Sequence, residues 1–503
     1  MKRGIAAFFA AGIALSICTG PVAQIAGPPS ARKPDLAKGW ASFGEGSYAD
    51  SMSAALAAAR STPGDPDALE LWARSAMAAG EPAKALPALN QLATRRGEVR
   101  DLRLLALAQA MAGDAAASRA TLLKAEEGKN PAPADLYALS WEREDAAGRL
   151  SLLRRSAAEF PAEAPLLAPE ISFWEARPPG ALRALAAPLP ADGSAVKLKT
   201  LYDGEWAVGK VGGEEIWLLV DTAARQTVLS REVAERLKLP VTQAAHPLPG
   251  AYPNEPAPAY TCLDSLELGP VRFLRVPALV VDDASRILRY REGRNVLKGI
   301  LGMDLLRGMK ARFDRQKNVL RLFPAGAPAS ALLDGDRAGW GEYRAFSVHD
   351  QVFVDSLLGQ KNGLLGLLAT GSTYVLAREA ALPETGLRAD SKRLVNLSFT
   401  NFVTPMSPVG EAAAGNSIAR PILLGWMEEC LPPVGNVRTV PREGVVGFGP
   451  ARGVITDLPL YPEPLGAEVP AQVVIGKKLT DFYAVALDLS AGRIYLKQVL
   501  FAR

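Results

Sequence analysis

Apolar residues follow two different rhythms along this 503-residue chain. From about residue 38 to 161, Ala and Leu recur at helical spacing with few runs that favour strands. From about residue 195 onward, the apolar residues form short runs bounded by Gly, Pro and Asn, which is typical of strands joined by hairpins. The pattern predicts an all-α part followed by an all-β part.

Turns containing glycine recur in the helical part at a nearly constant period. Gly46, Gly80 and Gly113 are separated by 34 and 33 residues. This period resembles that of tetratricopeptide repeats, in which two helices form each unit. We therefore expect a solenoid over residues 38–161, whose concave face would bind a peptide or a protein partner. A plain helical spacer is the alternative.

The β part carries the same plan twice. An apolar strand runs into Asp221-Thr222-Ala223 in "IWLLVDTAARQTVLSREVAERL", and a weaker copy, "LLGLLATGSTYVLAREAAL", runs into Ala369-Thr370-Gly371. Each copy ends in a similar tail, and one constant offset aligns Gly302 with Gly476. Two related half-domains are predicted.

Turn residues place hairpins in both copies. Gly212-Gly213 is expected to join two strands in the first copy, and Asn362-Gly363 in the second. Asp314 and Asp488 occupy matching positions in the two tails, each just before a turn. Because Asp commonly caps turns, we interpret both residues as structural.

An apolar strand ending in Asp-Thr-Gly, followed later by two apolar residues and Gly, resembles the aspartic peptidases of the retropepsin and pepsin type. The most similar group is bacterial, exported and retropepsin-like. The resemblance covers about Ala195 to the C-terminus. It implies a bilobal acid protease fold made of half-domain 196–327 and a degenerate half-domain 339–503.

The resemblance assigns the acid-base role to Asp221. These enzymes share one proton between two carboxylates, because like charges held that close cannot both ionise. Each half-domain normally supplies one Asp, but Ala369 stands at the second position. The sequence thus predicts half of a catalytic pair.

The remaining residues of the two active-site loops also have implied roles. Thr222 and Thr370 are expected to hydrogen-bond across to the opposite loop. The residue after each Thr is normally Gly, which lets the backbone turn tightly beside the carboxylate. Ala223 replaces it in the first loop, whereas Gly371 is retained in the second.

Three interpretations follow from the missing carboxylate. The chain is a pseudo-peptidase that binds an extended peptide between strands; or Asp221 meets its counterpart in a homodimer; or another carboxylate completes the site. Candidates for the last role are Asp304, Asp355 and Glu379. The predicted function is therefore an aspartic peptidase acting on polypeptides in the cell envelope, or an inactive scaffold that binds them.

Other chemistries have little support. The two histidines, His246 and His349, lie in loop-like sequence, so neither a zinc site nor a Ser-His-Asp triad is expected. No glycine-rich phosphate loop is present, and we expect no cofactor. A net charge of +4 is small for this length and gives no indication of a nucleic-acid partner.

The N-terminus is typical of an export signal. Lys2-Arg3 precedes an apolar run that ends at Cys18 and is too short to span a bilayer. We assign residues 1–26 to a signal peptide and expect a periplasmic or extracellular protein. Membrane contact is expected only if Cys18 is lipidated, although Ile17 stands where a lipoprotein signal has a small residue.

Two features concern the regions between the main parts. Residues 162–195 are rich in Pro and Ala and are predicted to form a linker with one short helix. After export two cysteines remain, Cys262 and Cys430, one in each half-domain. They form either one disulfide or two separate thiols, and their spacing does not decide between these.

Overall fold

The structure is a computed structural model of the chain. It describes residues 34–201, 204–245, 259–281, 298–314, 316–335, 337–348, 350–358, 361–371, 375–378, 395–396, 418–422, 446–447, 453–456, 473–476 and 483–498. Several expectations fall outside these residues and stay predictions: the signal peptide 1–26, lipidation at Cys18, and the roles of His246, His349, Glu379 and Cys430.

In the described part of the chain, nine helices between Pro34 and Glu175 form an array in which successive helices pack together. They are α1 (Pro34–Gly44), α2 (Tyr48–Ser61), α3 (Pro66–Ala78), α4 (Pro82–Arg95), α5 (Val99–Met111), α6 (Ala115–Ala125), α7 (Pro133–Glu142), α8 (Ala146–Glu159) and α9 (Ala164–Glu175). The predicted helical N-terminal part is thereby confirmed.

Glycine turns organise this array. Gly46, Gly80 and Gly113 adopt φ values of 83°, 78° and 90° directly before α2, α4 and α6. Glycine populates this left-handed region without the steric cost that other residues meet. The period seen in the sequence therefore marks the turn inside successive helix pairs. The identity of these pairs as tetratricopeptide repeats stays a prediction.

Residues 162–195 are more ordered than a linker. They contain α9 and β1 (Ala184–Leu185), which pairs antiparallel with β8 (Val271–Val281). Phe173 and Trp174 on α9 are buried in an apolar cluster that includes Leu219 and Ile300 of the β part. Pro165 lies in the first turn of α9, where no N–H donor is needed, whereas Pro169 lies inside the helix and removes one backbone donor there.

The β part has two halves. The first contains β2 (Ser194–Leu201), β3 (Gly204–Val211), β4 (Glu214–Val220), β5 (Thr227–Ser230), α10 (Arg231–Arg236), β6 (Thr242–Gln243), β7 (Ala259–Leu268), β8, β9 (Gly299–Leu301), β10 (Met309–Asp314) and β11 (Val319–Pro324). After α11 (Ala329–Leu332), the second contains β12 (Trp340–Val348), β13 (Gln351–Leu358), β14 (Lys361–Ala369), β15 (Val375–Arg378), β16 (Val395–Asn396), β17 (Ile418–Ile422), β18 (Val446–Gly447), β19 (Gly453–Thr456), β20 (Val473–Gly476), β21 (Tyr483–Asp488) and β22 (Arg493–Gln498).

The hairpin predictions have different outcomes. Gly212-Gly213, with φ values of 59° and 86°, joins β3 to β4 as expected. Asn362-Gly363 instead lies within β14, after the pairing of Leu358 with Lys361. The register of β13 with β14 shifts between Ser356 and Leu358, so the pairing is irregular opposite Asn362-Gly363.

The two halves join through one antiparallel sheet in the order β2, β11, β10, β21, β22, β12. At its centre Arg312 pairs with Ala486. The flanking pairs are Ala311 with Leu487 and Phe313 with Val485. The offset that aligns Gly302 with Gly476 also aligns Arg312 with Ala486, so these pairs exchange under a pseudo-twofold axis.

Asp314 and Asp488 have the structural role expected of them. Asp314 accepts a hydrogen bond from the backbone N–H of Lys317 at 3.1 Å, and Asp488 accepts one from Ala491 at 3.1 Å. Both carboxylates thus cap the turns that follow β10 and β21.

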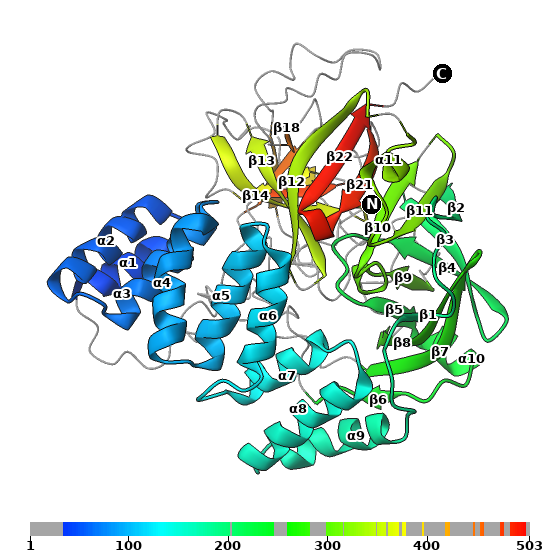
Figure 1. Cartoon of the computed structure of the whole chain (residues 1–503), viewed down its shortest axis with the longest axis horizontal. Helices are drawn as coiled ribbons and strands as arrows, with labels where there is room; N and C mark the ends of the chain where they lie inside the picture. Colours follow the sequence, from blue (N-terminus) through cyan, green and yellow to red (C-terminus); the bar gives the residue numbers. More distant parts are fainter. Residues whose placement is uncertain are drawn as a thin grey trace, which may run out of the picture.

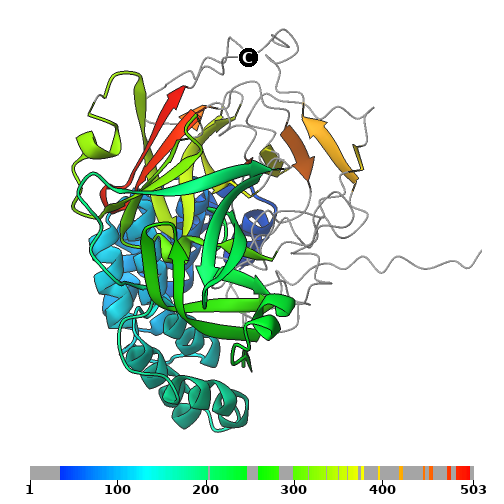
Figure 2. The same cartoon turned by 90° about the vertical axis from the view of Figure 1, so that its right-hand side faces the viewer.

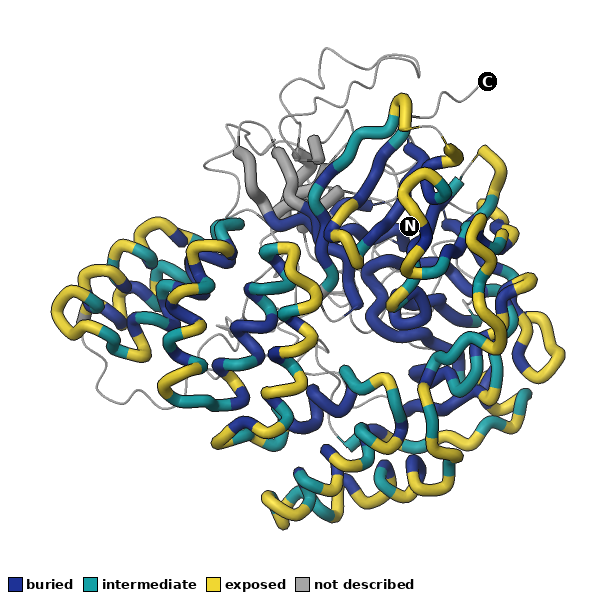
Figure 3. Tube along the Cα trace, in the orientation of Figure 1, coloured by how far each residue is buried: buried dark blue, intermediate teal, exposed yellow. Residues whose placement is uncertain are grey.

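The helical array curves along one side of the β unit, which we define as residues 194–498 (Figures 1 and 2). Figure 3 shows that the exposed positions gather on the outer sides of the helices and in loops, whereas the strands are largely buried. No helix in the described residues is long and apolar enough to span a membrane.

Candidate active site

The strand β4 delivers Asp221 to the middle of the β unit. β4 and β9 pair in parallel, with Leu219 beside Ile300 and Val220 beside Leu301. The N–H of Asp221 continues this ladder by donating to Leu301 O at 3.1 Å. The run of apolar residues in β4 is explained by this buried position between neighbouring strands.

The second half repeats this arrangement around Ala369. β14 and β20 pair in parallel, with Leu368 beside Ile475 and Ala369 beside Gly476. β5 lies antiparallel to β9 and parallel to β8, and β15 has the same relation to β20 and β19. The weaker copy predicted from the sequence therefore has the topology of the first copy.

Thr222 and Thr370 link the two loops through reciprocal hydrogen bonds. Thr222 Oγ1 donates to Leu368 O at 2.7 Å, and Thr370 Oγ1 donates to Val220 O at 2.9 Å. Each hydroxyl also accepts the backbone N–H of the other threonine at 3.1 Å. All four contacts lie within one chain, so the second half supplies the loop that faces Asp221. A homodimer stays a prediction.

The Asp221 carboxylate is buried, with 1% of its surface exposed. Its Oδ1 accepts N–H groups from Ala223 at 2.9 Å and from Gly371 at 3.2 Å. Its Oδ2 has no hydrogen-bond partner within the residues that the structure describes. Burial raises the pKa of Asp221 to about 6, although the two N–H groups act in the opposite direction.

Gly371 and Ala223 approach the site differently. A Cβ on Gly371 would lie 2.5 Å from Cγ of Asp221, so this position requires glycine for space. Ala223 is fully buried and keeps a negative φ. The sequence predicted a need for glycine at residue 223. Alanine is accommodated there, because the backbone does not enter the left-handed region.

No second carboxylate joins Asp221 among the described residues. Ala369, 2% exposed, occupies the position related to Asp221 by the pseudo-twofold. Asp304 is engaged elsewhere, because its Oδ1 accepts from Thr227 and its Oδ2 pairs with Arg183, both at 3.0 Å. Asp355 lies on β13, and Glu379 is outside the described residues.

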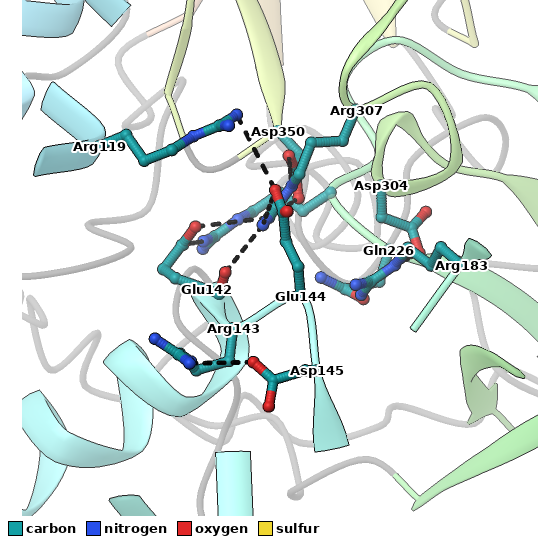
Figure 4. A network of polar contacts seen from close by, with 11 residues as sticks. Arg119, Glu142, Arg143, Glu144, Asp145, Arg183, Gln226, Asp304, Arg307 and Asp350 are labelled. Carbon is teal, nitrogen blue, oxygen red and sulfur yellow. Dashed lines mark hydrogen bonds and ion pairs between the residues drawn. The ribbon is translucent and has the colours of Figure 1, made fainter. Parts of the chain in front are cut away.

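A network of charged side chains, which no sequence pattern indicated, lies beside the first loop (Figure 4). Arg225 pairs with Glu142 of α7 at 3.3 Å. Arg307 donates to the backbone oxygen of Glu142 at 2.9 Å and to Asp350 of the second half at 2.7 Å. Residues so far apart along the chain meet only in the folded structure, so spacing could not have found them.

Gln351 contacts the active-site loop directly. Its Nε2 donates to Ala223 O at 2.7 Å. Gln351 opens β13 and is fully buried, so the second half supports the first loop from this side as well as through Thr370. No sequence pattern indicated a role for Gln351.

Cys262 is a free, buried thiol on β7. Burial raises its pKa, which disfavours the reactive thiolate. Its predicted partner, Cys430, lies outside the described residues. No group of three or more metal-binding side chains gathers in the described part of the chain.

Comparison with known proteins supports this description of the site. The aspartyl protease family matches residues 207–305, which include β4, Asp221 and Gly302. A search of curated protein sequences found no match.

Three solved structures illustrate the similarity. A retropepsin-like aspartic protease from Rickettsia conorii has 21% identity over 26% of this chain and 89% of its own, with a TM-score of 0.19. An aspartic proteinase from Irpex lacteus has 14% identity over 61% and 98%, with a TM-score of 0.33. The MamA protein has 14% identity over 28% and 78%, with a TM-score of 0.22.

The strand order and the loop contacts given above, rather than these low TM-scores, establish the architecture of the β unit. The parallel β4–β9 pair and Thr222 lie within the segment that matches the family. Residues 207–305, which carry Asp221, therefore match the aspartyl protease family.

Proposed function

We propose that this chain is an aspartyl-protease-family protein that binds extended polypeptide at the Asp221 site and does not cleave it by the two-carboxylate mechanism. The observation that carries this proposal is Ala369, which stands opposite Asp221 across the pseudo-twofold. A methyl group neither accepts nor donates a proton, so the pair that shares one proton cannot form.

The polypeptide ligand is proposed from the family resemblance and from the loop scaffold that remains. The threonine contacts hold both loops in place although one carboxylate is missing. A site between two β lobes can bind an extended chain through backbone hydrogen bonds, with side-chain pockets adding specificity.

Catalysis through Asp221 is the second candidate, and the properties of its carboxylate favour it. A pKa of about 6 lies near the value at which one group exchanges protons efficiently at neutral pH. The unpartnered Oδ2 is the atom that would contact water or substrate. A second acid from outside the described residues, such as Glu379, would be required.

The cellular location of the protein and the nature of the helical array are proposed from the sequence. The apolar run after Lys2-Arg3 supports export, and so a polypeptide ligand in the cell envelope. The period of the glycine turns supports a tetratricopeptide-like array. Lipidation at Cys18 and a protein partner on the concave face of the array also remain predictions.

The test compares the parent, Asp221→Asn and Asp314→Asn for binding and cleavage of a fluorescent unfolded casein between pH 4 and 7.5. Each is also made with Glu142→Gln, which weakens the ion pairs between the array and the β unit. We expect casein to bind and to remain intact by mass spectrometry. Cleavage that disappears in Asp221→Asn but persists in Asp314→Asn would establish the catalytic alternative. Absence of binding in every variant would refute both.

A further inference from the structure

Alternation along the strands defines which residues lie beside Asp221. Side chains two positions apart on a strand point to the same side, so Leu219 shares a face with Asp221, and Leu367 with Ala369. We call these four positions the Asp221 face. Leu219 and Leu367 are fully buried. In a site open to an extended chain, this face would be accessible.

Helices α7 and α9 cover the first half of this face. Leu219, Ala224 and Ile300 belong to one buried apolar cluster with Tyr137, Trp141, Phe173 and Trp174 of the array. The rings of Trp141, Phe173 and Trp174 lie 5.5, 4.9 and 5.9 Å from that of Tyr260 on β7. Contacts between large buried aromatic rings make this a substantial interface.

Helix α5 contacts β12 and extends the cover over the second half. A second buried cluster runs from Met77, Leu89 and Met111 of the array to residues of the β unit. Those residues are Ala223, Phe346, Phe353, Leu365, Leu367 and Ala369. Both active-site loops therefore contribute to apolar clusters that the array completes.

Glu142 connects the array to the charged end of the first loop. It pairs with Arg225, four residues after Asp221, and with Arg307, which also binds Asp350. The Glu142 side chain is 18% exposed, so this contact is only weakly screened by solvent. We call these contacts the Glu142 latch; Figure 4 shows the part formed by Glu142, Arg307 and Asp350.

A pocket borders the latch. It has a volume of about 430 Å³, is partly open to solvent and lies between the array and the β unit, with Leu107, Leu122 and Leu139 on one side and Met303, Leu306 and Met309 on the other. The interface near Glu142 is thus accessible to solvent along this pocket.

We infer that the helical array is a built-in cover of the Asp221 face, held by the Glu142 latch, and that a polypeptide reaches Asp221 only when the array moves away. This inference rests on the proposed function for the identity of the ligand. The covered state itself rests on burial alone, so the two can be tested separately.

The test measures the reactivity of single thiols in the full-length protein, with Cys18, Cys262 and Cys430 replaced by Ser. One reporter is placed on the covered face by Ala369→Cys, and a second by Leu367→Cys. Leu123→Cys, at a side chain that is 51% exposed, gives the rate for an open position. Ala486→Cys, in the sheet between the halves, reports opening of the whole β unit.

We expect the covered reporters to react at least ~100-fold more slowly than the exposed one, because reaction requires opening of the cover. Glu142→Gln should accelerate the covered reporters roughly 10- to 100-fold, the factor for losing a hydrogen bond to a charged group. The reporter at residue 486 should be unaffected. Glu175→Gln, which breaks the Arg154 pair within the array, is the matched control.

Three results would overturn the inference. The first is a reaction rate of the covered reporters equal to that of the exposed one. The second is an unchanged rate of the covered reporters in Glu142→Gln, and the third is an equal acceleration at residue 486 in that variant, which would indicate general unfolding. None of these readouts involves polypeptide binding, so the proposed function can fail while the cover is established.

Discussion

The carboxyl group of Asp221 occupies the space that a side chain on Gly371 would fill, with only 2.5 Å between Asp221 Cγ and an ideal Cβ at residue 371. The pseudo-twofold relates this pair to Ala369 and Ala223. One half-site therefore combines Asp with Gly, and the other combines Ala with Ala. The two departures from the family motif lie in different loops, but they belong to the same half-site.

Restoring the second carboxylate should require two substitutions. Ala369→Asp alone should lower the free energy of unfolding by about 1–3 kcal/mol, because the new carboxyl meets the Cβ of Ala223. Adding Ala223→Gly should recover at least ~1 kcal/mol, measured as coupling in a double-mutant cycle by urea unfolding. Ala224→Gly, at the next buried position, controls for the effect of glycine.

Peptide-bond cleavage should likewise require both substitutions. Cleavage of casein at acid pH is expected only in the double variant, and more readily with Glu142→Gln, because only that combination has two carboxylates and an accessible site. Purely additive stabilities, or equal cleavage by Ala369→Asp alone, would contradict the steric relationship between residues 223 and 369.

The reverse substitution should be tolerated only as a pair. Gly371→Ala should destabilise the protein by about 1–3 kcal/mol through contact with Asp221. Asp221→Ala in the same chain should relieve that contact, because it recreates the combination already present at residues 223 and 369. Thermal unfolding of the single and double variants measures the effect. Equal stability of Gly371→Ala and the parent would show that the loop adjusts freely.

Stability should depend on pH through Asp221. Its pKa is about 6 in the folded protein, raised by burial, whereas an unfolded Asp titrates near 4. Folding therefore favours the neutral carboxyl, and this stabilisation is present below pH ~4 and lost as the pH rises through 6. A pKa difference of about two corresponds to ~3 kcal/mol.

Asp221→Asn should remove this dependence, since an amide does not ionise. Urea unfolding should be measured at pH 4 and at pH 7.5. At pH 7.5 the free energy of unfolding of the variant should exceed that of the parent by up to ~3 kcal/mol. Asp314→Asn, a turn cap outside the site, should show no such difference. Parallel pH profiles for Asp221→Asn and the parent would mean that the carboxylate is hydrated rather than buried.

The contacts between the loops should dominate the stability of the site. Thr222→Val leaves the oxygen of Leu368 and the N–H of Thr370 buried without a partner, so it should cost about 2–4 kcal/mol. Thr370→Val should cost a similar amount. Ser53→Ala, which removes an exposed hydroxyl contact with the oxygen of Ala49, should change stability by less than ~0.5 kcal/mol.

The dependence of unfolding on protein concentration shows whether these contacts lie within one chain or between two chains. Because Thr222 and Thr370 belong to one chain, the unfolding midpoint should not change with protein concentration. A midpoint that rises with concentration, and more steeply in the parent than in Thr222→Val, would restore the interpretation in which two chains share one site.

Local pattern in the sequence was sufficient for the order of elements and for the pairing of the two half-domains. Helical spacing, glycine turns and the repeated strand into Asp221 or Ala369 each depend on neighbours along the chain, so they can be read there. The constant offset between the tails predicted two related half-domains, and the structure places their pseudo-twofold axis at the pairing of Arg312 with Ala486.

Tertiary structure alone decided what surrounds the site. Three features join residues far apart in sequence: the placement of Ala223 and Ala369 in one half-site, the links from Glu142 to Arg225 and Arg307, and the burial of Leu219 and Leu367 under the array. Such contacts leave no periodic signal, because each depends on how separately folded surfaces meet. The sequence therefore determined which carboxylate is present, whereas the packing of the helices over the β unit determined that it is covered.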